Sequence, residues 1–371
     1  MSTATSAPRI LLVRLSAIGD CLHALPLVAA LRRSMPGAFI GWATQEAPHQ
    51  LLHGHPLIDK FHVFPRGLFK RKEGTFFDRM RALRNFRKEL RDAGYETAID
   101  LQGLSKSGLV AWWSRARQRI GFKGEESREV NSLFMNHRVE PPETAVHIVD
   151  RNLALLGPLG ITPPDKAEWT LPAYTEERAA MAKFLETVGL MDGEKAKPFA
   201  VINPGATWLT KRWPAERLGE VAKGLIERRG LPLIVTWAGK DEQLAAEEIV
   251  KVAKHPEVRI APGTNLRELA ALFSYARLFV GNDTGPLHLA VALGVPCVSV
   301  FGASDPLRNG PYGHSNRIEA GGPECQPCWK TTCARKDLAC LMWVQAARVI
   351  SACEDLLERT TPALAGRKGA R

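Results

Sequence analysis

The stretch that most constrains this chain runs from Leu278 to Pro306, LFVGNDTGPLHLAVALGVPCVSVFGASDP. It opens with Leu278–Val280, an apolar run short enough for a buried strand. A polar loop follows, and Pro286 then stands where a helix can begin, because the first turn needs no N–H from that position. Pro296–Phe301 is a second apolar run. The pattern predicts a strand, a short helix and a parallel strand, which is the β-α-β unit of an α/β fold.

The loop and helix start of this unit form a candidate phosphate site. The first amides of a helix have no partner inside the helix, and its N-terminus carries partial positive charge, so phosphate can bind there. Gly285 opens the helix, Thr284 and His288 would add side-chain donors, and Asp283 stands beside them. An ordinary tight crossover in a parallel sheet is the alternative. The complete run DTGPLHLA favours a diphosphate site over it.

The segment GNDTGPLHLAVALGVPCVSVFG resembles the donor-binding signature of glycosyltransferase family 9, the lipopolysaccharide heptosyltransferases. The resemblance extends over nearly the whole chain. It implies a GT-B architecture: two Rossmann-like domains that face each other across a cleft, with the nucleotide-sugar held mainly by the C-terminal one. It also implies an inverting transfer of heptose from ADP-heptose to the lipopolysaccharide inner core.

Length and charge agree with these expectations. A chain of 371 residues is comfortable for two domains. The net charge of +11 favours anionic partners such as phosphorylated sugars or lipid headgroups, and the sequence carries no nucleic-acid-binding signature. It also contains no apolar run of the ~18 residues that span a bilayer, and no secretion signal. We therefore expect a cytoplasmic enzyme, in peripheral contact with the inner face of the inner membrane.

A proline-rich connector, ITPPDKAEWTLPA at residues 161–173, predicts the domain boundary. We expect an acceptor-side Rossmann-like domain over residues 1–165 and a donor-binding domain over 175–342. A C-terminal helix and tail, 343–371, would follow. In GT-B folds such a helix typically packs back on the first domain.

The N-terminal motif RLSAIGDCLHALP carries the candidate catalytic base. Only Gly19 is present where a dinucleotide loop requires three glycines, which argues against an NAD site. Asp20 stands at a helix start, where aspartate is a preferred N-cap. The motif resembles the family's N-terminal motif, whose aspartate is the proposed general base, so the resemblance assigns that role to Asp20. His23 is interpreted as a residue that packs in the core or supports the site residues from behind.

The segment NPGATWLTKRWPAERL combines a glycine-rich turn with two cations, which is typical of phosphate binding. It lacks the spacing of a Walker A loop. In the family, the lysine before the Trp-Pro pair contacts the donor diphosphate. That position maps to Lys211, with Arg212 as the neighbouring alternative, and Thr207 is a candidate hydroxyl partner.

A carboxylate beyond a strand end can hold ribose hydroxyls in nucleotide-binding folds. The buried run Leu231–Trp237 ends in AGKDEQ, and the family's glutamate at this place maps to Glu242, with Asp241 adjacent. An acidic first turn of a helix is the alternative interpretation.

The basic stretch between Arg66 and Arg91 is the first candidate for contact with an anionic acceptor. Its second part has apolar residues at helical spacing, so most of its charge is expected on a solvated face; such a basic amphipathic helix also suits a membrane surface. The loop FPRGLFKRKEG contributes Arg66 and Lys70. Arg119 and Arg128 lie in segments that resemble the family's acceptor side, and their guanidinium groups could bind carboxylates or phosphates.

Four cysteines follow in the pattern Cys325-x2-Cys328-x4-Cys333-x6-Cys340. Thiolates at such spacing can close a tetrahedral metal site; free buried thiols or a redox-dependent bridge are the alternatives. No Asp-x-Asp motif is apparent, so we expect transfer without a divalent ion and without a cofactor. Transfer of another nucleotide-activated sugar, or nucleotide binding without catalysis, stays open as an alternative function.

Overall fold

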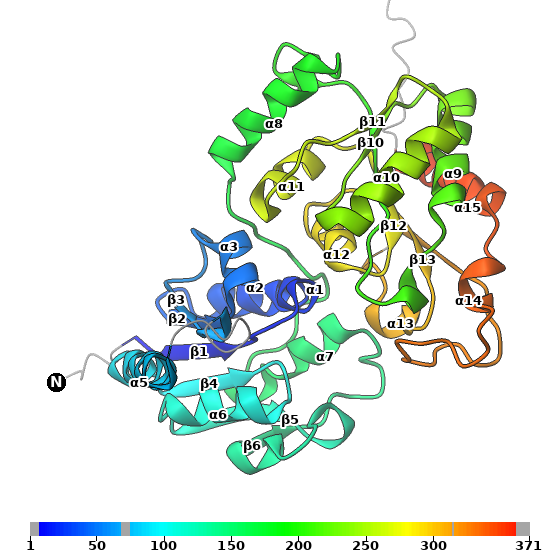
Figure 1. Ribbon diagram of the computed structural model, residues 1–371. Coiled ribbons are helices and arrows are strands. Elements are labelled where there is room, and N and C mark those ends of the chain that lie inside the picture. Colours follow the sequence, from blue (N-terminus) through cyan, green and yellow to red (C-terminus); the bar gives the residue numbers. More distant parts are fainter. Residues whose placement is uncertain (1–6, 68–74, 314, 361–371) are drawn as a thin grey trace, which may run out of the picture. The chain divides into compact units, whose positions relative to one another are not determined.

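The structure is a computed structural model that describes residues 7–67, 75–313 and 315–360. The chain divides into two compact units, Met1–Ala173 and Tyr174–Arg371. This division falls at the end of the proline-rich connector. Each unit contains one six-stranded sheet, and Figure 1 shows helices around the sheet of each unit.

The first unit is built on a parallel sheet of strand order β3-β2-β1-β4-β5-β6. The strands are β1 (Arg9–Val13), β2 (Phe39–Thr44), β3 (Lys60–Val63), β4 (Thr97–Asp100), β5 (Gln118–Phe122) and β6 (His137–Val139). This is the order of a Rossmann fold, in which ligands bind at the carboxyl ends of the strands where the order reverses, here between β1 and β4.

The helices of the first unit cover this sheet. They are α1 (Ile18–Leu22), α2 (Leu25–Ser34), α3 (Glu46–Leu52), α5 (Phe76–Asp92), α6 (Ser105–Trp113) and α7 (Ile148–Ala154), with short 3-10 turns η1 (Gly124–Glu126), η2 (Asn131–Phe134) and η3 (Gly157–Leu159). Phe86 and Leu90 of α5 are buried in the same apolar cluster as Leu11 and Val13 of β1. One face of α5 therefore belongs to the core, as its helical apolar spacing predicts.

The second unit repeats the same strand order in β11-β10-β9-β12-β13-β14, again all parallel. Its strands are β9 (Ala200–Asn203), β10 (Leu233–Val235), β11 (Val258–Ile260), β12 (Leu278–Asn282), β13 (Cys297–Phe301) and β14 (Asn316–Ala320); β7 (Met191–Asp192) and β8 (Lys195–Ala196) form a separate antiparallel pair. The expectation of two Rossmann-like α/β domains is confirmed.

The helices of the second unit include the one predicted in the opening stretch. They are α8 (Thr175–Thr187), α9 (Ala215–Arg229), α10 (Gly239–Ala253), α11 (Leu266–Phe273), α12 (Gly285–Ala292), α13 (Pro306–Asn309), α14 (Ala339–Met342) and α15 (Ala346–Thr360), with the 3-10 turn η4 (Leu209–Lys211). Strand β12, helix α12 and strand β13 form the predicted β-α-β unit, and α12 begins one residue before Pro286.

The C-terminal helix α15 is part of the second unit's core. Its residues Ile350 and Cys353 are buried in the same apolar cluster as Leu225 of α9. The two helices approach closely at Gly224, where an added Cβ would lie 2.5 Å from Cδ1 of Ile350. Within the second unit, the apolar face of this helix is therefore covered by α9 and the core of the second sheet.

Among the helices in the described ranges, none is long and apolar enough to cross a membrane.

Candidate functional site

The candidate site residues form two groups, one in each unit, and each group is described by itself. In the second unit most of them gather where β9 and β12 end, while Glu242 follows β10. In the first unit Asp20 and Arg66 follow the carboxyl ends of β1 and β3, whereas Arg119 lies within β5 and Arg128 after it.

Asp283, directly after β12, is the centre of a buried polar cluster in the second unit. Its Oδ2 lies 2.6 Å from Nζ of Lys211 and accepts a hydrogen bond of 2.5 Å from the Ser304 hydroxyl. Its Oδ1 lies 3.4 Å from Nε2 of His288. Only 5% of the Asp283 side chain is exposed. Three of the predicted donor residues, Lys211, Asp283 and His288, are thus brought into contact.

The charge state of this cluster follows from its contacts. Burial alone would raise the pKa of the Asp283 carboxyl, but the hydrogen bond from His288 and the charge of Lys211 outweigh it and hold that pKa well below its usual range. Asp283 is therefore ionised at neutral pH. Its charge holds the Lys211 ammonium in place, with the Trp208 ring centroid 4.7 Å from Nζ.

Asn282, the last residue of β12, fixes the loop that carries Lys211. Its side-chain amide donates to the Pro204 carbonyl at 2.8 Å, and its Oδ1 accepts from the Trp213 backbone N–H at 3.1 Å. The loop is therefore tied to the strand end on both sides of Lys211. Ser304 and Asn282 were not predicted as site residues, although Asn282 ends β12 and Ser304 lies three residues after the neighbouring strand β13.

The N-terminus of α12 lies beside this cluster in the chain. Thr284 is the N-cap residue, but its side chain makes no capping hydrogen bond and instead lies 3.4 Å from the Asn282 carbonyl. The first-turn amides of Gly285 and Leu287 have no partner within the helix. An uncapped helix start next to a lysine is suited to an anion such as a diphosphate.

Glu242 lies in the first turn of α10, and its side chain supports the start of that helix. Its Oε2 accepts from the Ala238 N–H at 2.9 Å, and an added Cβ at Gly205 would lie 2.1 Å from its Oε1. Burial raises the pKa of Glu242, partly offset by the Ala238 hydrogen bond and Arg212. The neighbouring Arg212 donates its Nε to the Ala206 carbonyl at 2.7 Å, which leaves Lys211 as the cation of the cluster. Thr207 is exposed.

Asp20 in the first unit is the third residue of α1, so it is not the N-cap, which is Ala17. Its Oδ2 accepts from the Ala17 N–H at 3.0 Å and lies 2.6 Å from Nη2 of Arg14. Its side chain is 33% exposed. The carboxylate thus supports the helix start from the third position and still reaches the surface.

Three cations of the first unit lie near one another, and one of them, Arg14, pairs with Asp20. Arg14 follows β1, Arg66 follows β3, and Lys106 lies in the first turn of α6 after β4. Burial, then the charges of Arg66 and Arg14, lower the pKa of Lys106. Arg66 donates to Oε1 of Gln45 at 2.8 Å. Arg14 and Lys106 were not predicted; Lys70 lies outside the described residues.

Arg119 does not join this cationic group. It is the second residue of β5, near the strand's amino end, and its guanidinium donates to the carbonyls of Phe134 at 2.7 Å and Ala116 at 2.8 Å. Two of its five N–H donors are thus used on backbone carbonyls, which orients the guanidinium toward the amino end of β5. Arg128 is exposed, and its backbone N–H donates to Gly103 at 2.8 Å.

Asp100, at the end of β4, orders the loop that carries Lys106. This fully buried carboxylate accepts from the Ser107 hydroxyl at 2.8 Å, the Asn131 amide at 2.6 Å and the Gln102 N–H at 2.9 Å. Burial raises its pKa and these hydrogen bonds lower it. The sequence signal for it was a lone aspartate between an apolar strand and a loop of small residues.

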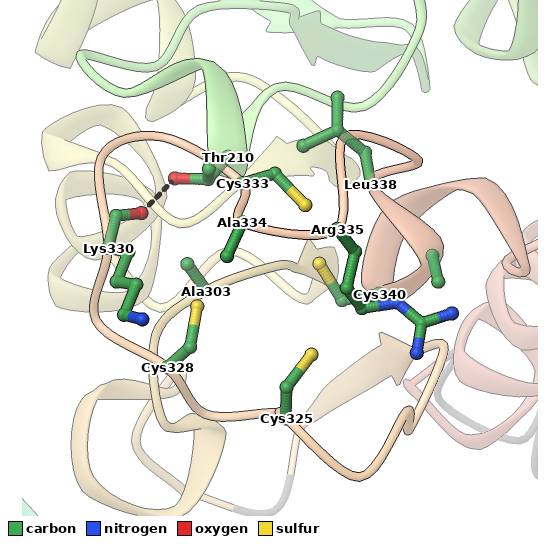
Figure 2. A pocket seen from close by; sticks show the side chains of 11 residues that line it. Thr210, Ala303, Cys325, Cys328, Lys330, Cys333, Ala334, Arg335, Leu338 and Cys340 are labelled. Carbon is green, nitrogen blue, oxygen red and sulfur yellow. Dashed lines mark hydrogen bonds between the residues drawn. The ribbon is translucent and has the colours of Figure 1, made fainter.

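The four cysteines of the Cys325–Cys340 segment line one cavity (Figure 2). Burial, then the other three thiols, raise the pKa of Cys340. Within the described ranges, no three or more His, Cys, Asp or Glu side chains are arranged to hold a metal ion.

Comparisons with known proteins agree with this geometry. The family model for glycosyltransferase family 9 (heptosyltransferase) matches residues 83–339. The chain is 29% identical to lipopolysaccharide heptosyltransferase 1 of Pseudomonas aeruginosa, over 88% of this chain and 87% of that protein. It is also 29% identical to lipopolysaccharide heptosyltransferase 3 of Escherichia coli, over 93% of this chain and 96% of that one.

Solved structures share the fold. The heptosyltransferase WaaC of E. coli with ADP superposes with a TM-score of 0.74 at 24% identity, covering 94% of this chain and 99% of that one. A glycosyltransferase family 9 protein of Veillonella parvula superposes with a TM-score of 0.79 at 22% identity, covering 97% and 100%. Since the family model spans well over half of the sequence, the chain belongs to glycosyltransferase family 9, the heptosyltransferases.

Proposed function

We propose that this glycosyltransferase moves heptose from ADP-heptose to the inner core of lipopolysaccharide, with inversion at the transferred carbon. The observation that carries the donor assignment is the cluster of Lys211, Asp283 and His288 at the uncapped start of α12. It is suited to a diphosphate by charge and by free amides. The names of the relatives support heptose as the sugar, and E. coli WaaC has been solved with ADP and with ADP-2-deoxy-2-fluoro heptose.

Lys211 is the proposed diphosphate ligand. An ammonium group has three N–H donors, and one of them is used on Asp283. The remaining donors can reach a phosphate while Asp283 keeps the side chain oriented. Thr284, Gly285 and the exposed Thr207 would line the same diphosphate, and Glu242 would accept from the ribose hydroxyls of the nucleotide.

Asp20 is the proposed general base. In a single displacement the acceptor hydroxyl attacks the anomeric carbon, its proton passes to Asp20, and the bond from that carbon to the ADP phosphate oxygen breaks. The electron pair of that bond leaves with ADP. Lys211 and the α12 amides stabilise the charge that develops on the leaving diphosphate. Arg14 holds the Asp20 carboxylate in one orientation, since the two groups are 2.6 Å apart.

These groups supply the charge compensation that a divalent ion supplies in other glycosyltransferases, so the proposed transfer is metal-independent. The acceptor would be a lipid-anchored, negatively charged core sugar. Arg66 and Lys106 are its proposed contacts in the described part of the first unit, with Arg128 at the edge of the same loop region.

An enzyme with a lipid-anchored acceptor has to act at a membrane surface, and the outer face of α5 is suited to contact with one. Phe77, Arg81, Arg84, Lys88 and Arg91 recur at intervals of three and four residues, so they form one stripe opposite the buried Phe86. Phe77 is 80% and its neighbour Phe76 67% exposed. Aromatic rings beside cations suit an anionic bilayer. We assign this face to peripheral contact with the inner side of the inner membrane.

Acceptor-dependent release of ADP from ADP-heptose tests the proposal. Release that requires a heptose-deficient core acceptor is the expected result. Nucleotide binding without release would indicate a non-catalytic binder, and release from a different nucleotide-sugar would indicate the same fold acting on another sugar. A binding screen of nucleotide-sugars separates these two outcomes.

A further inference from the structure

The segment from Glu324 to Asp337 is the part of the second unit that its apolar core does not explain. It contains no helix or strand, and none of its side chains is fully buried. Trp329 and Lys336 adopt left-handed backbone angles, with φ of 54° and 65°. A stretch of this composition cannot be fixed by hydrophobic burial, so its conformation requires another source of order.

Its four thiols converge on one place. Cys325, Cys328, Cys333 and Cys340 all line one cavity of about 60 Å³. Figure 2 shows their sulfur atoms around the same open space, with Ala303 and Ala334 beside them. Cys21, Cys297 and Cys353 are buried elsewhere in the chain. The cavity thus collects every cysteine of the segment, together with the α14 residue Cys340.

Four cysteine sulfurs are the ligand set of closed tetrahedral sites for thiophilic divalent ions such as Zn²⁺. As they stand, the described side chains are not drawn together for coordination, which requires metal–sulfur distances of about 2.3 Å. Three of the four are on the irregular segment and at least partly exposed, so they can turn inward without disturbing the core. We propose that a divalent thiophilic cation binds in this cavity and draws the four thiols together as thiolates, releasing their protons to solvent.

The cavity wall connects such an ion to the donor site. Thr210 and Ala303 both line the cavity, and they are the chain neighbours of Lys211 and Ser304. The Thr210 hydroxyl donates to the Lys330 carbonyl at 2.7 Å. The Ala303 carbonyl accepts from the N–H groups of Cys328 at 3.1 Å and Trp329 at 2.8 Å.

Lys211 and Ser304 are the two groups that contact the same oxygen of Asp283. An ion that fixes the segment therefore fixes the supports of the proposed diphosphate ligand, and it acts as a positioning element, not as a catalyst. Metal binding stands without the proposed function; only this effect on ADP affinity rests on it.

The test uses the full chain, purified with chelator and reductant, and Co²⁺ or Zn²⁺ alone as the probe. We expect one ion per chain by elemental analysis and, with Co²⁺, the thiolate charge-transfer and tetrahedral ligand-field bands. The variant Cys325→Ser changes an exposed side chain, so folding should be preserved. Its metal affinity should fall at least about tenfold, since changes outside the ligand set alone cost about 10–100-fold.

Cys297→Ala removes a thiol remote from the cavity and is the matched control, which should bind one ion as the unchanged chain does. Failure to bind an ion, equal affinity in Cys325→Ser, or disulfides among these four cysteines in the metal-free native protein would each overturn the site. Zn²⁺ should also raise the affinity for ADP several-fold, and less so in Cys325→Ser. Metal binding with unchanged ADP affinity would overturn the positioning role, whereas no ADP binding in any state would count against the proposed function and leave the metal site standing.

Discussion

Single carboxylates in this protein serve more than one purpose, and Asp20 is the clearest case. The same oxygen accepts from the Ala17 N–H and pairs with Arg14. The sequence pattern placed Asp20 at a helix start and offered two interpretations, a helix cap or a general base. These interpretations do not exclude each other, because a carboxylate at the third helical position supports the helix and still reaches solvent.

Substitution of Asp20 separates these two tasks. Asp20→Asn keeps an oxygen that can accept from Ala17 but cannot take a proton, so kcat should fall by about 10²–10⁴-fold while ADP binding is preserved. Asp20→Ala should lose the same activity and, because it also removes the hydrogen bond from the Ala17 N–H, destabilise the protein by about 1 kcal/mol. Steady-state kinetics, calorimetric ADP titration and denaturant unfolding measure the three quantities. Near-normal turnover in Asp20→Asn would exclude the general-base role.

The ionised Asp283 carboxylate should make the stability of the protein depend on pH. Its pKa is lowered in the folded state, so its ionised form stabilises the protein above the unfolded-state pKa of about 3.9, and this contribution is lost as the pH falls toward the folded-state value. Asp283→Asn should therefore be less stable than the unchanged chain at pH 5 to 7, and the difference should shrink below about pH 4. Urea unfolding between pH 3 and 7 measures it. A difference independent of pH would contradict the ionised state assigned to Asp283.

The acceptor-side cations allow a matched pair of variants. Arg66→Gln with Lys106→Gln should raise the KM for the acceptor by about tenfold or more, since hydrogen bonds to charged groups contribute about 1.5–3 kcal/mol, and should leave the KM for the donor unchanged. Arg119→Gln is the control, because its guanidinium is engaged by backbone carbonyls. If the control alters the acceptor KM and the double variant does not, the assignment of the acceptor region is wrong.

At the scale of elements, the sequence was most informative where the pattern of one segment determines its structure. The strand, proline-started helix and strand at 278–301 form as predicted, because apolar runs, a helix-initiating proline and a terminating glycine are local signals. Helix α15 shows the opposite case. Its amphipathic spacing predicts one buried face but does not identify the element that covers this face. Here helix α9 covers it, with the closest approach at Gly224.

The outer stripe of α5 is predicted to bind anionic membranes. Phe77→Ser with Arg84→Gln and Arg91→Gln should reduce binding to vesicles that contain anionic lipid more strongly than binding to neutral vesicles, because the neutral surface loses only the contact with the Phe77 ring. Added salt should mimic the loss of charge, since exposed charges are screened over about 8 Å at physiological ionic strength. Cosedimentation with the two vesicle types measures it.

A second helix supplies the control for α5. Leu244 of α10 is 54% exposed, with Lys240 and Lys251 on the same face by helical spacing. Leu244→Ser with both lysines changed to Gln removes two positive charges and one exposed apolar side chain, as the α5 variant does. If the α5 variant and this α10 variant lose the same amount of vesicle binding, net charge, and not the α5 surface, drives the association.

At the scale of the whole molecule, the same strand order occurs twice, and this explains which site residues could be predicted. Residues that follow a strand end, such as Asp283, are visible in the sequence because the carboxyl edge of a parallel sheet is where ligands bind. Their partners are not visible. Lys211 and Ser304 reach Asp283 because β9 and β13 flank β12, and that adjacency comes from the strand order, not from any spacing along the chain.

Arg119 illustrates the same limit from the other side. Its sequence neighbourhood resembled an acceptor region, but its position at the start of β5 points it to local carbonyls. Which end of a strand a residue occupies depends on where the strand begins, and strand boundaries are the least certain part of a pattern. The sequence therefore predicted a positive charge at Arg119. The groups that this charge contacts depend on where β5 begins, which the sequence pattern defines only to within a few residues.

The last prediction concerns metal ions in the whole enzyme, where two different roles must be separated. The leaving diphosphate is matched by Lys211 and the α12 amides, so brief exposure to EDTA in the assay should leave transfer unchanged. A four-thiolate ion in the cavity near Cys325 would leave slowly, and its loss should lower ADP affinity and thermal stability without abolishing the chemistry of transfer. The measurement is kcat and the KM for donor after brief and after exhaustive chelation, each followed by Mg²⁺ or Zn²⁺. Immediate loss that Mg²⁺ restores would contradict metal-independent transfer; slow loss that only Zn²⁺ restores would locate the effect at the thiols, because Mg²⁺ prefers oxygen ligands and does not compete for sulfur.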